Sequence, residues 1–180
     1  MNFYLIILFL HILGTAGIFL GLGIEGITLK FLNRASTTEQ LLNWRPSIKF
    51  LRITFSISTV LLLLPGIYMV IEVWNWTGWV IMGLIILVVL SGTGSMTGKK
   101  IGEVMKSLSN SDVSLLAEAK EKLSAPYLIK VFKIKIFIVA GTIFIMTLKT
   151  DWIASIAVIV VSSLIGLLIT GVSSKKQVVT

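Results

Sequence analysis

The chain has 180 residues, of which 56% are apolar and only 13% are charged, and its mean hydropathy is +0.98. A soluble domain is typically about 45–50% apolar and about 25% charged, so this composition excludes a soluble enzyme and a disordered tail. A net charge of +8 indicates the positive-inside bias of a membrane protein, and we expect no nucleic-acid partner. The absence of cysteine and the single histidine exclude thiolate metal sites and every motif that needs two histidines.

Five segments are long and apolar enough to cross a membrane, since a span needs about 20 residues for roughly 30 Å of hydrocarbon. The first apolar run has no preceding Lys or Arg and continues well past a signal-peptide core, so we interpret it as a membrane helix. The sequence therefore predicts an all-α protein, a single domain over 1–180 that forms a five-helix bundle. The expected spans are 3–29, 50–73, 78–98, 129–148 and 152–172.

The basic residues predict the orientation of the bundle. Fifteen of the sixteen Lys and Arg lie in 30–52, 99–135 and 175–176, and only Lys149 lies on the other side. Because cytoplasmic loops carry the excess of Lys and Arg, we expect the N-terminus outside and the C-terminus in the cytoplasm. The expected location is a bacterial cytoplasmic (inner) membrane, with the lipid bilayer as the first partner.

Two local patterns modify this bundle. Pro65 inside the second span removes a backbone donor, so we expect a kink there. Residues 112–123 carry an apolar stripe behind a capping residue, which predicts a short surface helix. That helix would rest on the inner membrane face or dock on a partner, either a second copy or another membrane protein.

Helix packing is predicted from small residues. Gly14, Gly17 and Gly21 lie within about 60° of one another on a helix, and small residues let helices approach closely. We therefore expect Gly17 and Gly21 to contact another helix with no side-chain layer between them. The Gly94 and Gly98 pair has the same small-xxx-small spacing and predicts a second close contact.

Glu25 falls on the glycine face of the first span, near its inner end. An ionisable side chain within a membrane segment is a candidate functional residue because its burial is costly. One interpretation is an ion pair with Arg52, Lys133 or Lys135, which are expected at a similar depth. The alternative is a bound cation or a proton relay.

His11 borders the same face in the outer half of the first span. Three interpretations are open: an interhelical hydrogen bond, a haem or metal ligand, and a proton-handling group. Haem would need a second axial ligand. That ligand would be a lysine or methionine of this chain, with Met69 and Met146 the best-placed methionines, or His11 of a second copy.

Short motifs carry a resemblance. His11-Ile12-Leu13-Gly14, Pro65-Gly66-Ile67-Tyr68, the Trp74–Trp79 segment and Pro126-Tyr127 resemble the bacterial domain-of-unknown-function 2269 family of integral membrane proteins, over roughly residues 3–150. An early histidine followed by small residues is also similar to HemJ-type and CopD-type membrane proteins. The second resemblance implies haem at His11, which HemJ-type proteins pair with a lysine further along the chain.

These observations leave three functional hypotheses. The first is a small multi-pass membrane protein without catalysis, serving as an accessory or assembly subunit. The second is a haem-binding redox protein that uses His11. The third is a small transporter or ion-handling protein that uses Glu25. A catalytic role is the less favoured interpretation, since no set of residues in the sequence forms a catalytic motif.

Overall fold

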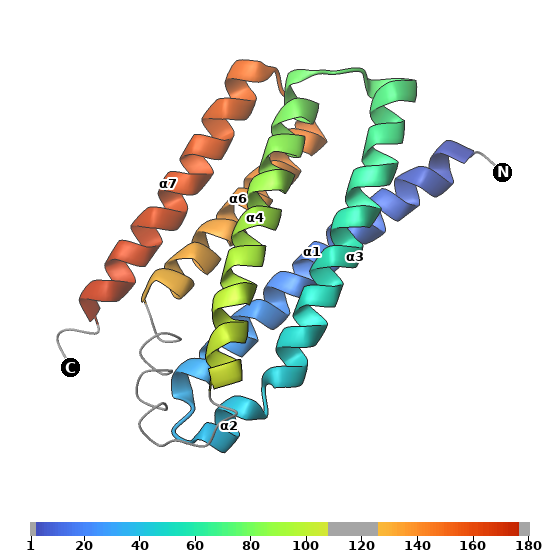
Figure 1. Cartoon of the computed structure of the whole chain (residues 1–180). Helices are drawn as coiled ribbons and strands as arrows, with labels where there is room; N and C mark the ends of the chain where they lie inside the picture. The colour runs from blue at the N-terminus through green and yellow to red at the C-terminus, as the bar shows by residue number, and fades with distance from the viewer. Residues whose placement is uncertain (1–2, 108–125, 177–180) are drawn as a thin grey trace.

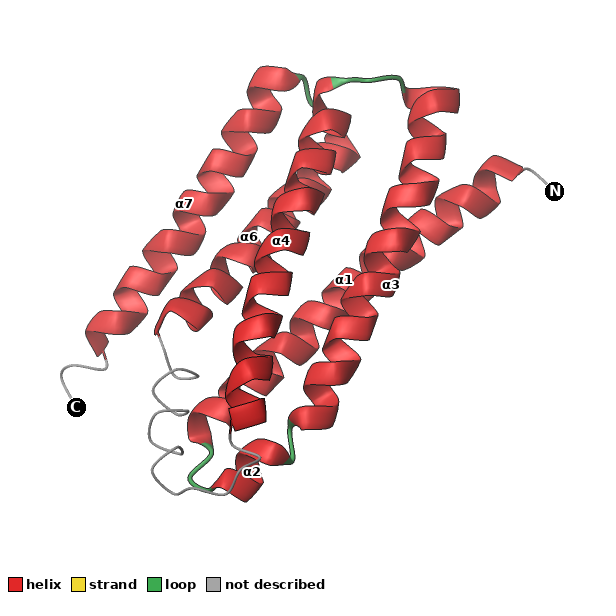
Figure 2. Cartoon of the chain, viewed as in Figure 1, coloured by secondary structure: helices red, strands yellow, loops and turns green. Residues whose placement is uncertain are grey.

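The computed structural model describes residues 3–107 and 126–176, and all regular structure within these ranges is helical (Figure 2). Five of its helices are long and apolar enough to cross a membrane, which confirms the predicted all-helical class and number of spans. The elements are α1 (Phe3–Arg34), α2 (Thr38–Leu42), α3 (Arg45–Met69), the π-helical turn η1 (Val70–Trp74), α4 (Gly78–Ser107), α6 (Pro126–Leu148) and α7 (Trp152–Lys176).

The helices run beyond the expected spans because their polar ends continue the same helix. The first span, 3–29, lies within α1, and 50–73 lies within α3 and η1. The expected surface helix at 112–123 lies outside the described residues. Pro65 does not end α3, which continues to Met69 and then widens into the π-helical turn η1.

The bundle consists of two closely packed helix pairs with α4 between them. Figure 1 shows α1 inclined across α3, while α6 and α7 lie beside each other on the far side of α4. The most extensive helix contact joins α1 to α3, and the next joins α6 to α7. We call α1/α3 the first pair and α6/α7 the second pair.

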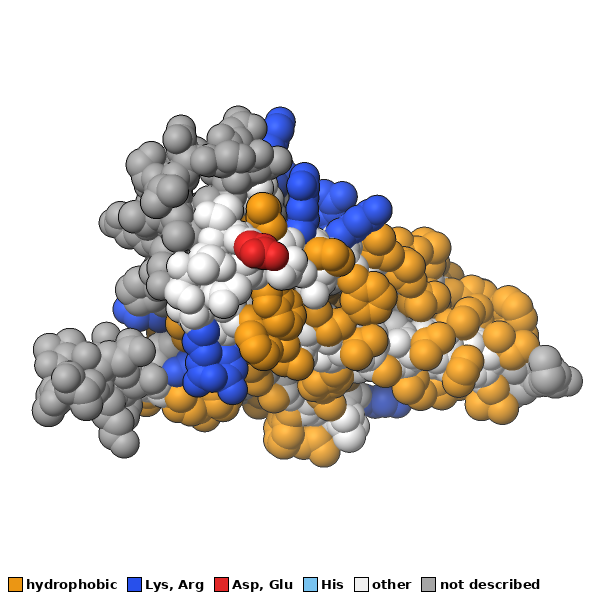
Figure 3. Space-filling view, turned by 90° about the horizontal axis from the view of Figure 1, so that it is seen from below, with side chains coloured by type: hydrophobic (Ala, Val, Ile, Leu, Met, Phe, Trp, Pro, Cys, Tyr) orange, Lys and Arg blue, Asp and Glu red, His pale blue; other side chains and the backbone are white. Residues whose placement is uncertain are grey.

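The connections lie at two ends of the bundle. The N-terminal end of α1 and the turns at 75–77 and 149–151 lie at one end, and α2 lies at the other (Figure 1). Thr37 caps α2 by accepting a hydrogen bond from the Gln40 backbone N–H at 3.2 Å. Seen from the α2 end, Lys and Arg side chains gather around the rim, outside a mostly apolar surface (Figure 3).

Three small clusters of buried side chains follow one another along the bundle. Near α2, the cluster centres on Leu32, Leu41 and Met105, and at the opposite end it centres on Val70 and Trp79. Between them Ile18, Leu22 and Val139 join α1 to α6. Many other large apolar side chains are exposed on the outside of the helices, which suits a surface in contact with lipid.

Candidate functional site

Glu25 and Lys135 form a buried ion pair between α1 and α6. The Lys135 Nζ donates to the Glu25 Oε1 at 2.5 Å, and the two residues are only 3% and 4% exposed. Of the three basic residues considered from the sequence, the structure brings Lys135 to Glu25. Arg52 is exposed and Lys133 is half-buried, and neither forms a salt bridge among the described residues.

The position of Lys135 follows from the face of α6 on which it lies. Leu128 and Val139 are buried, and they stand seven residues before and four residues after Lys135. Residues at these spacings share one helix face, so the lysine is carried into the bundle by its apolar neighbours. Lys133 lies two residues earlier and falls on a different face.

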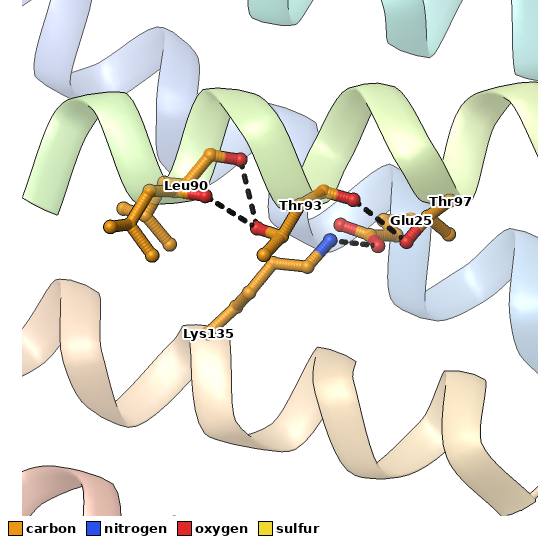
Figure 4. A network of polar contacts seen from close by, with 6 residues as sticks. Glu25, Leu90, Thr93, Thr97 and Lys135 are labelled. Carbon is orange, nitrogen blue, oxygen red and sulfur yellow. Dashed lines mark hydrogen bonds and ion pairs between the residues drawn. The ribbon is translucent and has the colours of Figure 1, made fainter.

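Threonines of α4 complete a polar centre around the ion pair (Figure 4). The Thr97 hydroxyl donates to the Thr93 carbonyl at 3.0 Å, and the Thr93 hydroxyl donates to carbonyls of its own helix. In Figure 4 the Thr97 side chain points toward the Glu25 carboxylate. Two buried atoms, Glu25 Oε2 and Thr28 Oγ1, have no hydrogen-bond partner among the described residues.

His11 lies in the first pair, where α1 crosses α3. Its Nδ1 donates to the Leu62 backbone carbonyl at 3.0 Å, since a carbonyl oxygen only accepts. Its ring meets Trp74 edge-on with centroids 6.4 Å apart, and a Cβ on Gly66 would lie 3.2 Å from the ring. Pro65 leaves the Leu61 carbonyl without its helical donor, and His11 bonds the neighbouring Leu62 carbonyl in the same turn of α3.

The haem hypothesis for His11 stays a prediction. The Nδ1 bond to the Leu62 carbonyl leaves Nε2 as the nitrogen for a ligand, and ligating histidines commonly make such a bond with the other ring nitrogen. Gly66 lies beside Cε1 and Nδ1, and the Trp74 indole meets the ring at an edge. A Cβ added to Gly83 would lie 2.5 Å from the Met146 Cε, so Met146 packs against that glycine. Met69 is fully buried. Within the described residues, no group of three or more His, Asp or Glu side chains could hold a metal ion.

The glycine stripe of α1 lies against α3, with one difference from the expectation. A Cβ on Gly14 would lie 2.8 Å from the Leu62 backbone N, so the two backbones touch there. At Gly17 the neighbour is the Ser58 hydroxyl, and at Gly21 it is the Phe55 ring at 3.1 Å. The expected contact without side chains is therefore made by Gly14, while small or flat side chains fill the space at the other two.

A second glycine contact, which we did not expect from the sequence, holds α6 to α7. Gly141 faces the Ser162 hydroxyl, and a Cβ on Gly166 would lie 3.0 Å from the Ile134 Cα. The predicted contact at Gly94 and Gly98 is not found, because a Cβ on either would meet no atom of the described part of the chain within 4 Å. Gly141 has no small residue four positions away, but Ser162 and Gly166 have the small-xxx-small spacing, which is the signal in the sequence that we missed.

Two open grooves of about 400 Å³ flank α1. One lies between α1 and the start of α3, with Thr28, Trp44, Ser47 and Phe50 among its lining residues. The other lies between α1 and α6, with Gly23, Gly26 and Phe132 among its lining residues. Both walls are mostly apolar, and neither groove is lined by His11 or by the charged atoms of the ion pair.

Comparison with known proteins finds no match for this chain. No family model matches the chain, and no curated protein or solved structure matches it. The resemblance to the domain-of-unknown-function 2269 family and to HemJ-type and CopD-type proteins stays a prediction from the short motifs. The function must therefore be argued from the bundle and its polar centre.

Proposed function

We propose that the chain is an accessory or assembly subunit of a membrane complex and catalyses no reaction itself. The observation that supports this proposal is how the buried polar groups are used. His11 bonds α1 to α3, the Glu25–Lys135 pair joins α1 to α6, and the α4 threonines bond their own helix. Catalysis needs reactive groups that converge on a cavity, whereas the two grooves here have mostly apolar walls.

The test of this proposal is the state of the chain in native membranes. Extracted with its surrounding lipid in polymer nanodiscs, the chain should run with a second protein in a fixed ratio. Deleting its gene should lower the level of that same protein, because unassembled membrane subunits are degraded. A chain that runs as a lone protein in native nanodiscs, with no protein lost on deletion, would contradict the proposal.

We further propose that the N-terminus lies outside and the α2 end faces the cytoplasm of a bacterial cell. The support is the fifteen-to-one distribution of basic residues, together with their gathering around the α2 end (Figure 3). A cytoplasm-active reporter fused after Thr180 should be active there, and a periplasm-active reporter should be silent. The reverse pattern would overturn the orientation.

A second candidate function, ion handling at Glu25, is favoured by the carboxylate oxygen that has no partner. Proton relays in membranes use buried carboxylates of this kind. Purified protein in liposomes containing a pH-sensitive dye should then conduct protons, and Glu25→Gln should abolish the flux. If wild type and Glu25→Gln leak at the rate of empty liposomes, ion handling is excluded and the accessory role is unaffected.

A further inference from the structure

The geometry points to a binding site for one water molecule inside the bundle, held between Glu25 and Thr28. Oε2 of Glu25 and Oγ1 of Thr28 are buried, the two residues being 3% and 2% exposed, and neither atom has a hydrogen-bond partner among the described residues. Residues three apart lie on the same helix face, so both side chains extend from the same face of α1. Buried polar atoms are nearly always satisfied by protein or by ordered water.

Thr28 differs from several other membrane threonines, including the buried Thr97 and Thr170, in what its hydroxyl does. Thr15, Thr59 and Thr142 each donate to the carbonyl four residues earlier, at 3.2, 2.8 and 2.7 Å. Such bonds to the preceding turn are the usual solution for a threonine within a helix. Thr28 makes no such bond, so its proton is available to a ligand beside Glu25.

The chemistry of the two atoms selects the ligand. A carboxylate oxygen requires a donor and the threonine hydroxyl supplies one, so the ligand both donates and accepts. The charges of Glu25 and Lys135 already cancel each other. An added cation would be repelled by the nearby Lys135 ammonium, and an added anion would be repelled by the free carboxylate oxygen. Uncompensated charge is costly at low dielectric. A neutral molecule with two to four polar partners is what a buried water requires.

The groove between α1 and α3 gives the route by which this water exchanges. Thr28, three residues after Glu25 on α1, lines that groove together with Ser47 at the start of α3. The start of α3 belongs to the α2 end of the bundle, where the basic side chains gather. Glu25 is thus reached by water from the α2 end, whichever partner the subunit serves.

Water-edited solid-state NMR of the full chain in lipid bilayers tests this site. With ¹³C-labelled Glu and Val, and the Glu25 and Val139 signals assigned from their loss in Glu25→Gln and Val139→Ile, the Glu25 carboxyl carbon should receive magnetisation from water at short mixing times. Thr28→Val, which keeps the shape and removes the hydroxyl, should slow that transfer to the level of the dry Val139 side chain. Thr28→Ser should retain it, and Thr59→Val is the matched control that should leave it unchanged.

Two results would overturn the site. If the wild-type Glu25 carboxyl receives magnetisation no faster than Val139, no water is bound there. If Thr28→Val transfers as fast as wild type, Thr28 does not hold the water. Should Thr28→Val fail to fold, the wild-type and Thr28→Ser measurements still decide, and neither depends on a flux or a partner being found.

Discussion

The first pair and the second pair of helices pack by the same device, a glycine of one helix against a serine of the next. In α1/α3 the contact is Gly17 on Ser58, and in α6/α7 it is Gly141 on Ser162. Lipid is as apolar as the helices, so helices in a membrane associate through close packing and polar contacts. In each helix pair, therefore, the absence of a glycine side chain lets the two helices approach closely and pack against each other.

The two pairs differ in what is added to the glycine contact. Both pairs also have a glycine against backbone, Gly14 on Leu62 in the first and Gly166 on Ile134 in the second. The first pair adds the His11 hydrogen bond, and a segment containing α2 joins its helices. The second pair is joined by a short turn in which Lys149 has a φ of 50° and Asp151 accepts a hydrogen bond from the α7 backbone. The Glu25–Lys135 ion pair then links α1 of the first helix pair to α6 of the second. Close packing therefore holds the helices within each pair together, and the ion pair joins the two helix pairs.

Breaking the ion pair is the largest expected effect. Lys135→Met should lower the free energy of unfolding by roughly 3–5 kcal/mol, because it leaves the Glu25 carboxylate buried without its partner. Thermal unfolding in lipid nanodiscs measures the loss. Lys133→Met, two residues away on α6 and without a described ion pair, is the matched control and should cost much less.

The double variant separates the charge from the packing. Glu25→Gln with Lys135→Met removes both charges and should recover much of the stability lost in either single variant. If the stability losses of the two single variants simply add in the double variant, Glu25 and Lys135 are not coupled. The ion pair would then not join the two helix pairs.

Adding a side chain at Gly14, where the α1 and α3 backbones touch, should have the next largest effect on stability. Gly14→Ala would place a Cβ 2.8 Å from the Leu62 N and 2.9 Å from the Leu61 C, and backbone atoms cannot rotate away. We expect a loss of about 1–3 kcal/mol in the free energy of unfolding. Gly94→Ala meets open space and should be neutral or slightly stabilising. Equal thermal shifts in the two variants would contradict the contact.

The number and class of the helices were predictable because apolar length alone decides a membrane span. What hydropathy could not give is the rotation of each helix about its axis. Gly94 and Gly98 have a packing spacing but face open space, whereas Gly141 has no such spacing and packs on Ser162. A spacing tells which residues share a face, and only the neighbouring helix decides whether that face is used.

The candidate site was predictable to the same extent. Glu25 could be marked as a buried carboxylate, and depth alone left Arg52, Lys133 and Lys135 as partners. The choice of Lys135 follows from the buried Leu128 and Val139 on its face. That periodicity is weak in α6 because apolar residues surround the whole helix, so the face becomes visible only in the bundle.

A smaller effect is expected at the turn that joins the second pair. Asp151 Oδ1 accepts from the Ala154 backbone N–H at 2.8 Å and so caps the start of α7. Asp151→Ala should cost about 0.5–2 kcal/mol, as loss of an N-cap does, and Asp151→Asn should retain most of the stability. Thermal unfolding distinguishes them, and an unchanged melting temperature in Asp151→Ala would show that the glycine contact alone aligns α6 with α7.

The smallest effect is expected for the histidine of the first pair. His11→Ala removes the hydrogen bond to the Leu62 carbonyl and the edge contact with Trp74. Polar contacts between membrane helices are worth about 0.6 kcal/mol on average, so the loss of stability should be well below that of Gly14→Ala. Wild-type protein purified from haem-replete cells should show no Soret absorbance, because neither groove beside α1 reaches the His11 ring. A Soret band that disappears in His11→Ala and persists in Glu25→Gln would instead make His11 a ligand. The first pair would then differ from the second in carrying a cofactor as well as a polar contact.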